Sequence, residues 1–343
     1  MRLLAVVFAV GGVAFGFIGW GAAISAAVPA PSGRVLVYAT PPGVGYGVCR
    51  PECRPDRAWV WRASVEGRKR ARLTHGLAPV VSPDGRWVAF VRARRDGTET
   101  EIDLIRSRAG AVRRLVRLTA NEPVYKLIWA PDSRRLVAAF VGRVVSLSPN
   151  GEATILDGAN LDQISFSPDG SQLAYVKTVE TPLGYLSNVY ITSVSGGEPR
   201  RITSEGDAEA PVWGTDGIAF LRNDGNIWIV QPDGTGLRQL TLGSLWIRPV
   251  AWSQDGTRLL GENPPHHNGR LWAVDGRTGA ARTITGWVGG LDALGLSRDG
   301  RTILATTGHG GFLGCVGRIE TIPYAGGQPH VLLPRTCDAS WNG

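Results

Sequence analysis

The feature that most constrains this chain is an internal repeat. Six segments share one pattern: an apolar residue, two intervening residues, an aspartate that glycine usually follows, and then an apolar run. The aspartates are Asp84, Asp132, Asp169, Asp216, Asp255 and Asp299. Their spacings of 48, 37, 47, 39 and 44 residues average about 43. A period of that length is typical of solenoids, propellers and other arrays in which each repeat is one structural unit.

Each pattern has the chemistry of a tight turn between two strands. In Ser82–Gly85, which reads Ser-Pro-Asp-Gly, proline fixes φ at the second position of a type I turn and glycine suits the fourth. The runs that follow, such as Trp87–Val91 and Leu173–Val176, are apolar on both faces and must be covered on both faces. Sheets stacked radially against their neighbours meet this requirement, whereas a free-standing sandwich would leave alternate residues exposed.

A second marker, an apolar pair or an apolar residue followed by threonine, closes each unit. It occurs seven times: Leu73-Thr74, Leu118-Thr119, Ile155-Leu156, Ile202-Thr203, Leu240-Thr241, Ile284-Thr285 and Leu332-Leu333. A third strand and a glycine turn lie between the two markers, most plainly in Asn226–Thr241. Each unit therefore holds four strands in about 43 residues, which is the size of one β-propeller blade.

The two ends of the chain explain why seven closing markers accompany only six aspartate turns. Trp341 falls on the repeat position that Trp129, Trp213 and Trp252 occupy, which is a blade-packing position. Near the other end, Ser32–Tyr38 imitates the strand that follows Asp84. We expect the last strand to complete a blade whose other strands come from residues 34–74, which removes a free sheet edge.

The sequence therefore predicts an all-β chain with one domain, a seven-bladed propeller of four-stranded blades over residues 34–343. A six-bladed ring would require one marker to be accidental. Residues 1–30 are set apart, because Arg2 precedes a stretch without charge at 3–28. This is the composition of an export signal, with cleavage expected after Ala27 or Ala30.

The same stretch is also long enough to span a bilayer, so an uncleaved N-terminal anchor is the alternative, and a buried helix is a third interpretation. Signal and anchor both place the remaining chain outside the cytoplasm. The protein is then either secreted or attached to the cytoplasmic membrane through residues 3–28.

The Trp-Ser-Pro-Asp-Gly type of turn, with its apolar strand and closing Leu-Thr, resembles the WD40-like PD40 repeats. These occur in TolB-type propellers and in the propeller domains of prolyl-oligopeptidase-like peptidases, and the resemblance covers about 34–343. The TolB pattern has six blades after a separate α/β domain, for which this chain has no room. The peptidases need a Gly-x-Ser-x-Gly elbow, which this sequence lacks. The resemblance implies the fold, and neither activity carries over.

Four cysteines occur, at Cys49, Cys53, Cys315 and Cys337. Export favours disulfides over free thiols. The repeat places the first two in one loop of the first blade and the others in the adjoining seventh blade and the connection to the closing strand. We predict the pairs Cys49–Cys53 and Cys315–Cys337, and a four-thiolate zinc site is the alternative.

The candidate ligand-binding residues map to one face, which carries the loops between second and third strands and between blades. They are His75, His266, His267, His309, Arg92, Arg94 and Arg95. Neutral imidazoles near the axis could bind a metal, as in some propeller lyases that act on acidic sugars. The alternative is that these loop side chains only face water. We expect no cofactor and no metal, and we assign no catalytic residue.

Arginine dominates the charge, with 34 Arg against 3 Lys and a net charge of +8. Basic runs lie at 68–72, 92–95 and 106–114 in the first two predicted blades. They indicate either a patch for an anionic surface, such as phospholipid or cell-wall polymer, or a solvated rim. Export argues against nucleic acid as a partner.

The leading hypothesis is a monomeric, non-catalytic propeller outside the cytoplasm that binds a protein or cell-envelope ligand through loops on one face. The alternative is a metal-dependent lyase or hydrolase that acts on a polysaccharide through histidines of the same face.

Overall fold

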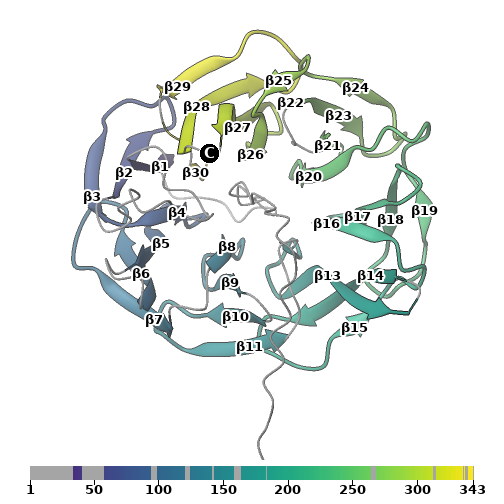
Figure 1. Cartoon of the computed structure of the whole chain (residues 1–343), viewed down its shortest axis with the longest axis horizontal. Coiled ribbons are helices and arrows are strands. Elements are labelled where there is room, and N and C mark those ends of the chain that lie inside the picture. Colours follow the sequence, from purple (N-terminus) through teal and green to yellow (C-terminus); the bar gives the residue numbers. More distant parts are fainter. Residues whose placement is uncertain are drawn as a thin grey trace, which may run out of the picture.

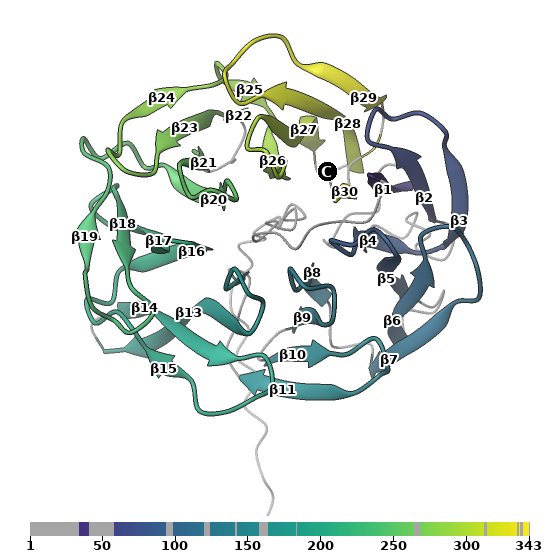
Figure 2. The same cartoon turned by 180° about the vertical axis from the view of Figure 1, so that it is seen from behind.

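The predicted seven-bladed propeller is confirmed. The computed structural model describes residues 34–40, 58–93, 99–119, 124–140, 143–157, 164–182, 184–263, 268–311, 314–334, 336 and 339–342. These residues form strands and turns, with no helix among them. Seven four-stranded antiparallel sheets stand around a central axis, as Figure 1 and the reverse view in Figure 2 show.

The first four blades, with strands given from the axis outward, have the following bounds. Blade 1 contains β30 (Ala339–Trp341), β1 (Val35–Thr40), β2 (Trp59–Ser64) and β3 (Ala71–His75). Blade 2 contains β4 (Leu77–Val81), β5 (Trp87–Ala93), β6 (Glu99–Arg106) and β7 (Arg113–Thr119). Blade 3 contains β8 (Val124–Trp129), β9 (Leu136–Phe140), β10 (Arg143–Leu147) and β11 (Ala153–Asp157). Blade 4 contains β12 (Ile164–Phe166), β13 (Gln172–Thr181), β14 (Gly184–Ser193) and β15 (Arg200–Arg201).

The other three blades follow the same plan. Blade 5 contains β16 (Ala208–Gly214), β17 (Gly217–Arg222), β18 (Ile227–Val230) and β19 (Arg238–Gln239). Blade 6 contains β20 (Arg248–Trp252), β21 (Arg258–Glu262), β23 (Leu271–Asp275) and β24 (Ala281–Thr283). Blade 7 contains β26 (Asp292–Leu296), β27 (Thr302–Gly311), β28 (Gly314–Pro323) and β29 (His330–Pro334). A separate pair, β22 (Asn268–Gly269) and β25 (Val288–Gly289), joins a loop of blade 6 to the connection toward blade 7.

The last strand closes the ring, as the sequence predicts. Strand β30 pairs antiparallel with β1, with Leu36 opposite Trp341 and Tyr38 opposite Ala339. Asn342 occupies the position that the first serine of the turn has in other blades, and it makes equivalent hydrogen bonds. Its side-chain Oδ1 accepts a hydrogen bond from the Val35 N–H at 2.6 Å, and its N–H donates to the Val35 carbonyl at 3.2 Å. Blade 1 thus reproduces the hydrogen bonds of the turn although no covalent turn joins β30 to β1.

The repeated aspartates are turn residues held by local hydrogen bonds. In blade 6 the Gly256 N–H donates to the Ser253 carbonyl at 3.0 Å, and Gly256 has a φ of +69° that favours glycine. Asp255 Oδ1 accepts from the Ser253 hydroxyl at 2.6 Å and from the Thr257 N–H at 3.0 Å. These bonds, that of Ser253 foremost, lower the pKa of Asp255 to about 2.

The closing threonines also have a structural reason. The hydroxyl Oγ1 of Thr203, Thr241 and Thr285 accepts a hydrogen bond from the third strand of its blade. The donors are the backbone N–H groups of Val189, Ile227 and Leu271, at 2.9, 2.8 and 3.1 Å. This bond satisfies a backbone group where the outer strand leaves the ladder, which explains why threonine recurs there.

The core lies between the blades. The indole N–H of Trp129 in blade 3 donates to the Val80 carbonyl of blade 2 at 3.1 Å, and Trp252 in blade 6 makes the same bond to Val212 of blade 5. Both rings are buried. Apolar side chains of neighbouring sheets pack into shared clusters, so each blade is covered on both faces, as its residue pattern requires.

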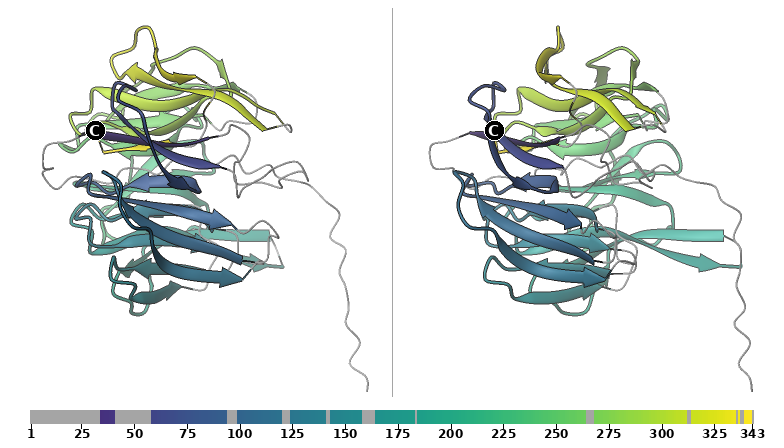
Figure 3. Two further views of the ribbon diagram at one scale, coloured as in Figure 1. Left: turned by 90° about the vertical axis from the view of Figure 1, so that its left-hand side faces the viewer. Right: turned by 60° about the vertical axis from the view of Figure 1, so that its left-hand side comes forward.

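The two faces of the ring differ. Turns from first to second strand and from third to fourth strand lie on one side, here called the bottom face, and the other connections lie on the top face. The hairpins β13–β14 of blade 4 and β27–β28 of blade 7 have the longest strands, with ten residues each, and β13–β14, teal in Figure 3, ends on the top face. The described residues form no helix that could cross a membrane, and the predicted segment 3–28 lies outside those residues.

Candidate binding surface on the top face

The structure places few of the predicted histidines. His75 ends β3 at the top face, where it is exposed and its ring centroid lies 3.6 Å from that of Trp59. His309 falls within β27, but its side chain is not described, and His266 and His267 lie outside the described residues. In the described part of the chain, no group of three or more His, Cys, Asp or Glu residues could hold a metal ion. Because the side chains of His266, His267 and His309 are not described, the structure does not test the lyase or hydrolase hypothesis.

Of the three predicted arginines, Arg92 is described, and Arg94 and Arg95 lie outside the described residues. The Arg92 guanidinium lies 3.2 Å from Asp103 Oδ2 on the neighbouring strand. Burial raises the pKa of Asp103, and the Arg92 charge lowers it. Arg92 thus forms an ion pair within blade 2.

The disulfide predictions also fall largely outside the described residues. Cys315 lies in β28 opposite Gly310 of β27, and its side chain is not described. Cys49, Cys53 and Cys337 lie outside the described part. The pairing Cys49–Cys53 and Cys315–Cys337 stays a prediction.

A different feature of the top face stands out, which is its exposed apolar side chains. Of the nine large apolar residues exposed in the described part, six lie on top-face segments of blades 4 to 7. We call these six the apolar band: Val179, Tyr185, Leu186, Leu242, Trp246 and Trp287. The exposed fractions of Tyr185, Leu242 and Trp287 are 70%, 78% and 58%. An apolar concentration of this kind is typical of an interaction surface.

The first part of the band is the tip of the β13–β14 hairpin. Its strands pair as far as Thr181 opposite Gly184, and the hydroxyls of Thr178 and Ser187 lie 2.8 Å apart. The Ser187 N–H donates to the Gly206 carbonyl at 2.9 Å, in the connection from blade 4 to blade 5. Leu186 packs over the same glycine, since a Cβ at Gly206 would lie 2.7 Å from it. The hairpin is therefore fixed to the neighbouring connection.

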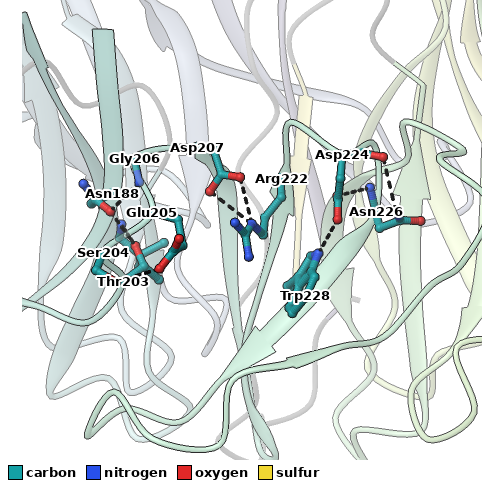
Figure 4. Close-up of polar contacts among 11 residues, drawn as sticks. Asn188, Thr203, Ser204, Glu205, Gly206, Asp207, Arg222, Asp224, Asn226 and Trp228 are labelled. Carbon is teal, nitrogen blue, oxygen red and sulfur yellow. Dashed lines mark hydrogen bonds and ion pairs between the residues drawn. The ribbon is translucent and has the colours of Figure 1, made fainter.

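The middle of the band rests on a polar network, shown in Figure 4. Asn188 Oδ1 accepts from the Gly206 N–H at 3.1 Å. Next along the chain, both carboxylate oxygens of Asp207 accept from Arg222 Nε, at 3.1 and 2.8 Å. The Arg222 guanidinium lies over the Trp228 ring at 4.7 Å, and the Trp228 indole N–H donates to Asp224 at 2.9 Å. These contacts join the connection before blade 5 to the top turn of that blade.

Trp246 continues the band above that turn. The backbone N–H of Trp246 donates to the Gly225 carbonyl at 2.8 Å. The indole ring covers Gly225 so closely that a Cβ there would lie 2.9 Å from the indole nitrogen. Trp246 has a φ of +52°, which is costly for a bulky residue. Asn263 helps to hold it, because its amide donates to the Trp246 carbonyl at 3.2 Å and its oxygen accepts from the Trp272 indole at 2.6 Å.

The far end of the band is Trp287, in the connection from blade 6 to blade 7. The Arg270 guanidinium lies 4.4 Å from the Trp287 ring centroid and 5.8 Å from that of Trp272. Contacts among the supporting residues thus link the blade 4 hairpin, the Trp246 segment and Trp287. The repeat pattern does not predict this surface, although one signal was present: Trp246 and Trp287 lie off the repeat position that the core tryptophans share.

A second feature, near the axis, is a buried group of charged side chains. Arg248 begins β20 and pairs with Glu262 at the end of β21, and both are buried. The second carboxylate oxygen of Glu262 accepts from the Ala293 N–H at 3.1 Å. Burial raises the pKa of Asp292 well above its usual range; Glu262 adds to this rise, and Arg248 and Lys126 oppose it. Glu262 is the ion-pair partner of Arg248, and burial favours the protonated form of Asp292.

The protonation of Asp292 predicts a stability that depends on pH. The pKa of an unfolded aspartate is about 3.9, so the folded chain binds this proton more tightly. The free energy of unfolding should then fall as pH rises from about 4 toward the raised pKa. Asp292→Asn removes this loss and should raise the melting temperature at pH 8 by a few degrees, without raising it at pH 4. Calorimetry at the two pH values checks this, and an equal effect at both would contradict it.

Comparison with known proteins identifies the fold alone. No family model and no curated protein matches this chain. Among solved structures, the β-propeller domain of the trilobed protease from Pyrococcus furiosus is 14% identical with a TM-score of 0.60, covering 92% of this chain and 99% of that domain. That domain has an open velcro topology, whereas β30 closes the ring here.

Two further structures are similar. A putative TolB from Agrobacterium tumefaciens is 20% identical with a TM-score of 0.52, covering 65% of this chain and 84% of that one. An oligogalacturonate lyase in complex with manganese is 14% identical with a TM-score of 0.58, covering 74% and 76%. A putative TolB and a lyase thus show the same fold at low identity, so fold similarity does not identify the function of this chain.

Proposed function

We propose that this chain is a non-catalytic propeller, outside the cytoplasm, that binds a protein partner through the apolar band of its top face. The observation that carries the proposal is the concentration of exposed apolar side chains on blades 4 to 7. Two are tryptophan and one is tyrosine, and these types are enriched among the residues that dominate binding energy. The uncharged segment 3–28 supports the location.

The proposed mechanism is rigid presentation. Hydrogen bonds fix the hairpin tip to Gly206 and the Trp246 segment to Gly225 and Asn263. Side chains that are ordered before binding lose little conformational entropy on association. A partner with a complementary apolar patch would therefore meet a surface already in its binding conformation.

The test compares two triple variants in cells that carry the protein natively. Tyr185→Ser/Leu242→Ser/Trp287→Ser removes three members of the band. The matched control, Ile155→Ser/Leu237→Ser/Val331→Ser, removes the other three exposed large apolar residues of the described part. After crosslinking and affinity purification, quantitative mass spectrometry should recover one partner with the native chain and the control, and at least tenfold less with the band variant.

Two outcomes would contradict the proposal. One is undiminished recovery with the band variant, and the other is an equal loss with the control. Circular dichroism of both variants establishes that each is folded before recovery is compared.

A further inference from the structure

Basic and acidic side chains are unevenly distributed over the bottom face. In the bottom-face turns of blades 7, 1 and 2, together with Arg34 at the start of blade 1, eight basic residues stand against three carboxylates. In the bottom-face turns of blades 3 to 6, three basic residues stand against seven carboxylates. The seven exposed cations of the first group form what we call the basic sector: Arg34, Arg68, Lys69, Arg70, Arg86, Arg108 and Arg301.

The turns of the basic sector adjoin one another. Hydrogen bonds from Ser64 and Ser297 lower the pKa of Glu66 in blade 1 and of Asp299 in blade 7, and the charge of Arg34 lowers both further. The Arg298 guanidinium of blade 7 donates to the Pro83 carbonyl of blade 2 at 2.8 Å, which spans the end of blade 1. The sector is therefore one continuous surface across three blades.

We propose that the basic sector rests on a lipid bilayer that contains anionic phospholipid. The described turns of the basic sector join neighbouring strands over only a few residues, whereas the long hairpin β13–β14 ends on the top face (Figure 3). A basic surface of this kind is attracted by anionic headgroups, to which each cation near the bilayer contributes. This proposal goes beyond the apolar band, which lies on the opposite face.

The position of Arg34 supports a bilayer over another polyanion. Strand β1 begins at Val35 on the bottom face, so the preceding chain reaches the ring there. Five residues, 29–33, separate the uncharged stretch 3–28 from Arg34. Fully extended, that connection spans about 20 Å. If 3–28 is the predicted anchor, the basic sector cannot lie far from the headgroups, and the apolar band faces away from the membrane.

The test measures protection of individual arginines in the full chain, reconstituted into vesicles. Phenylglyoxal labels arginine, and peptide mass spectrometry gives the labelling rate at each site. With 30% phosphatidylglycerol in phosphatidylcholine, labelling at Arg68, Arg86 and Arg108 should be about fivefold slower than in pure phosphatidylcholine. The exposed control sites Arg201, Arg238 and Arg277 of blades 4 to 6 should keep their rates.

A variant separates charge attraction from simple shielding. In Arg68→Gln/Arg108→Gln, protection at Arg86 should fall to less than half, whereas Arg201→Gln/Arg277→Gln should leave it unchanged. Equal rates in both lipids, or equal protection at all six arginines, would overturn the proposal. Stronger protection by a soluble polyphosphodiester than by the anionic vesicles would overturn it in favour of a cell-wall polymer.

Discussion

Replacing Trp341 by alanine is expected to lower the free energy of unfolding by about 3–5 kcal/mol, as for other large core residues. Trp341 is 5% exposed and lies in β30, the strand that completes blade 1. It packs with Leu36 and Tyr38 from the start of the chain and with Leu294 and Leu304 from blade 7. Its loss would weaken the contact between the two ends of the chain, so urea denaturation should show the effect.

The matched control is Trp287→Ala, which removes the same side chain from an exposed site. Because Trp287 is exposed in the folded chain, its replacement should change the free energy of unfolding by less than about 1 kcal/mol. If Trp341→Ala were as mild as Trp287→Ala, the closing strand would not hold the ring together.

Arg248→Met is the second substitution with a large expected effect. It leaves the Glu262 charge buried beside Asp292 with its ion-pair partner removed. Breaking a buried pair by removing one partner costs about 3–5 kcal/mol, because the remaining charge stays out of water. We expect a loss of that size in the free energy of unfolding, measured by urea denaturation at pH 7.

A double variant shows whether the buried charge is the cause. In Arg248→Met/Glu262→Gln no charge remains on the pair, and glutamine keeps an acceptor for the Ala293 N–H. Replacing both members of a buried pair is often nearly neutral, so most of the lost stability should return. A double variant as unstable as Arg248→Met would mean that packing, not charge, explains the loss.

The ring could be predicted because its determinants are local and recur. Asp255 and Ser253 make a turn within five residues, and Thr241 bonds to a strand only 14 residues away. Each such signal appears once in most blades, so counting them gave the number of blades. The closure by Trp341 followed from the same count, since its repeat position was filled while its turn was missing.

The apolar band could not be predicted from the repeat because it depends on contacts between blades that no repeat specifies. Leu186 and Gly206, or Asn263 and Trp246, meet only because connections of different blades adjoin on the top face. The positive φ of Trp246 has no signature in the residue type. Likewise, Asp292 and Glu262 look like ordinary strand-end acids until the fold buries them together.

The one-sided bottom face and the apolar band together define an orientation for the molecule. The basic sector would face the membrane, and Trp246 and Tyr185 would face away from it, where a partner protein can reach them. The two proposals can be tested independently. The arginine-labelling experiment measures protection of side chains on the bottom face, and the band variants change side chains on the top face.

The most direct test of the account is a site-specific photocrosslink on the top face. A photoreactive phenylalanine analogue replaces Tyr185, which is 70% exposed at the hairpin tip, and in a parallel chain it replaces Leu237 of the bottom face. Irradiation of intact cells should yield one discrete protein adduct from position 185 and none from position 237. Identical adduct patterns at both positions, or no protein adduct at 185, would contradict the claim that the top face binds a protein partner.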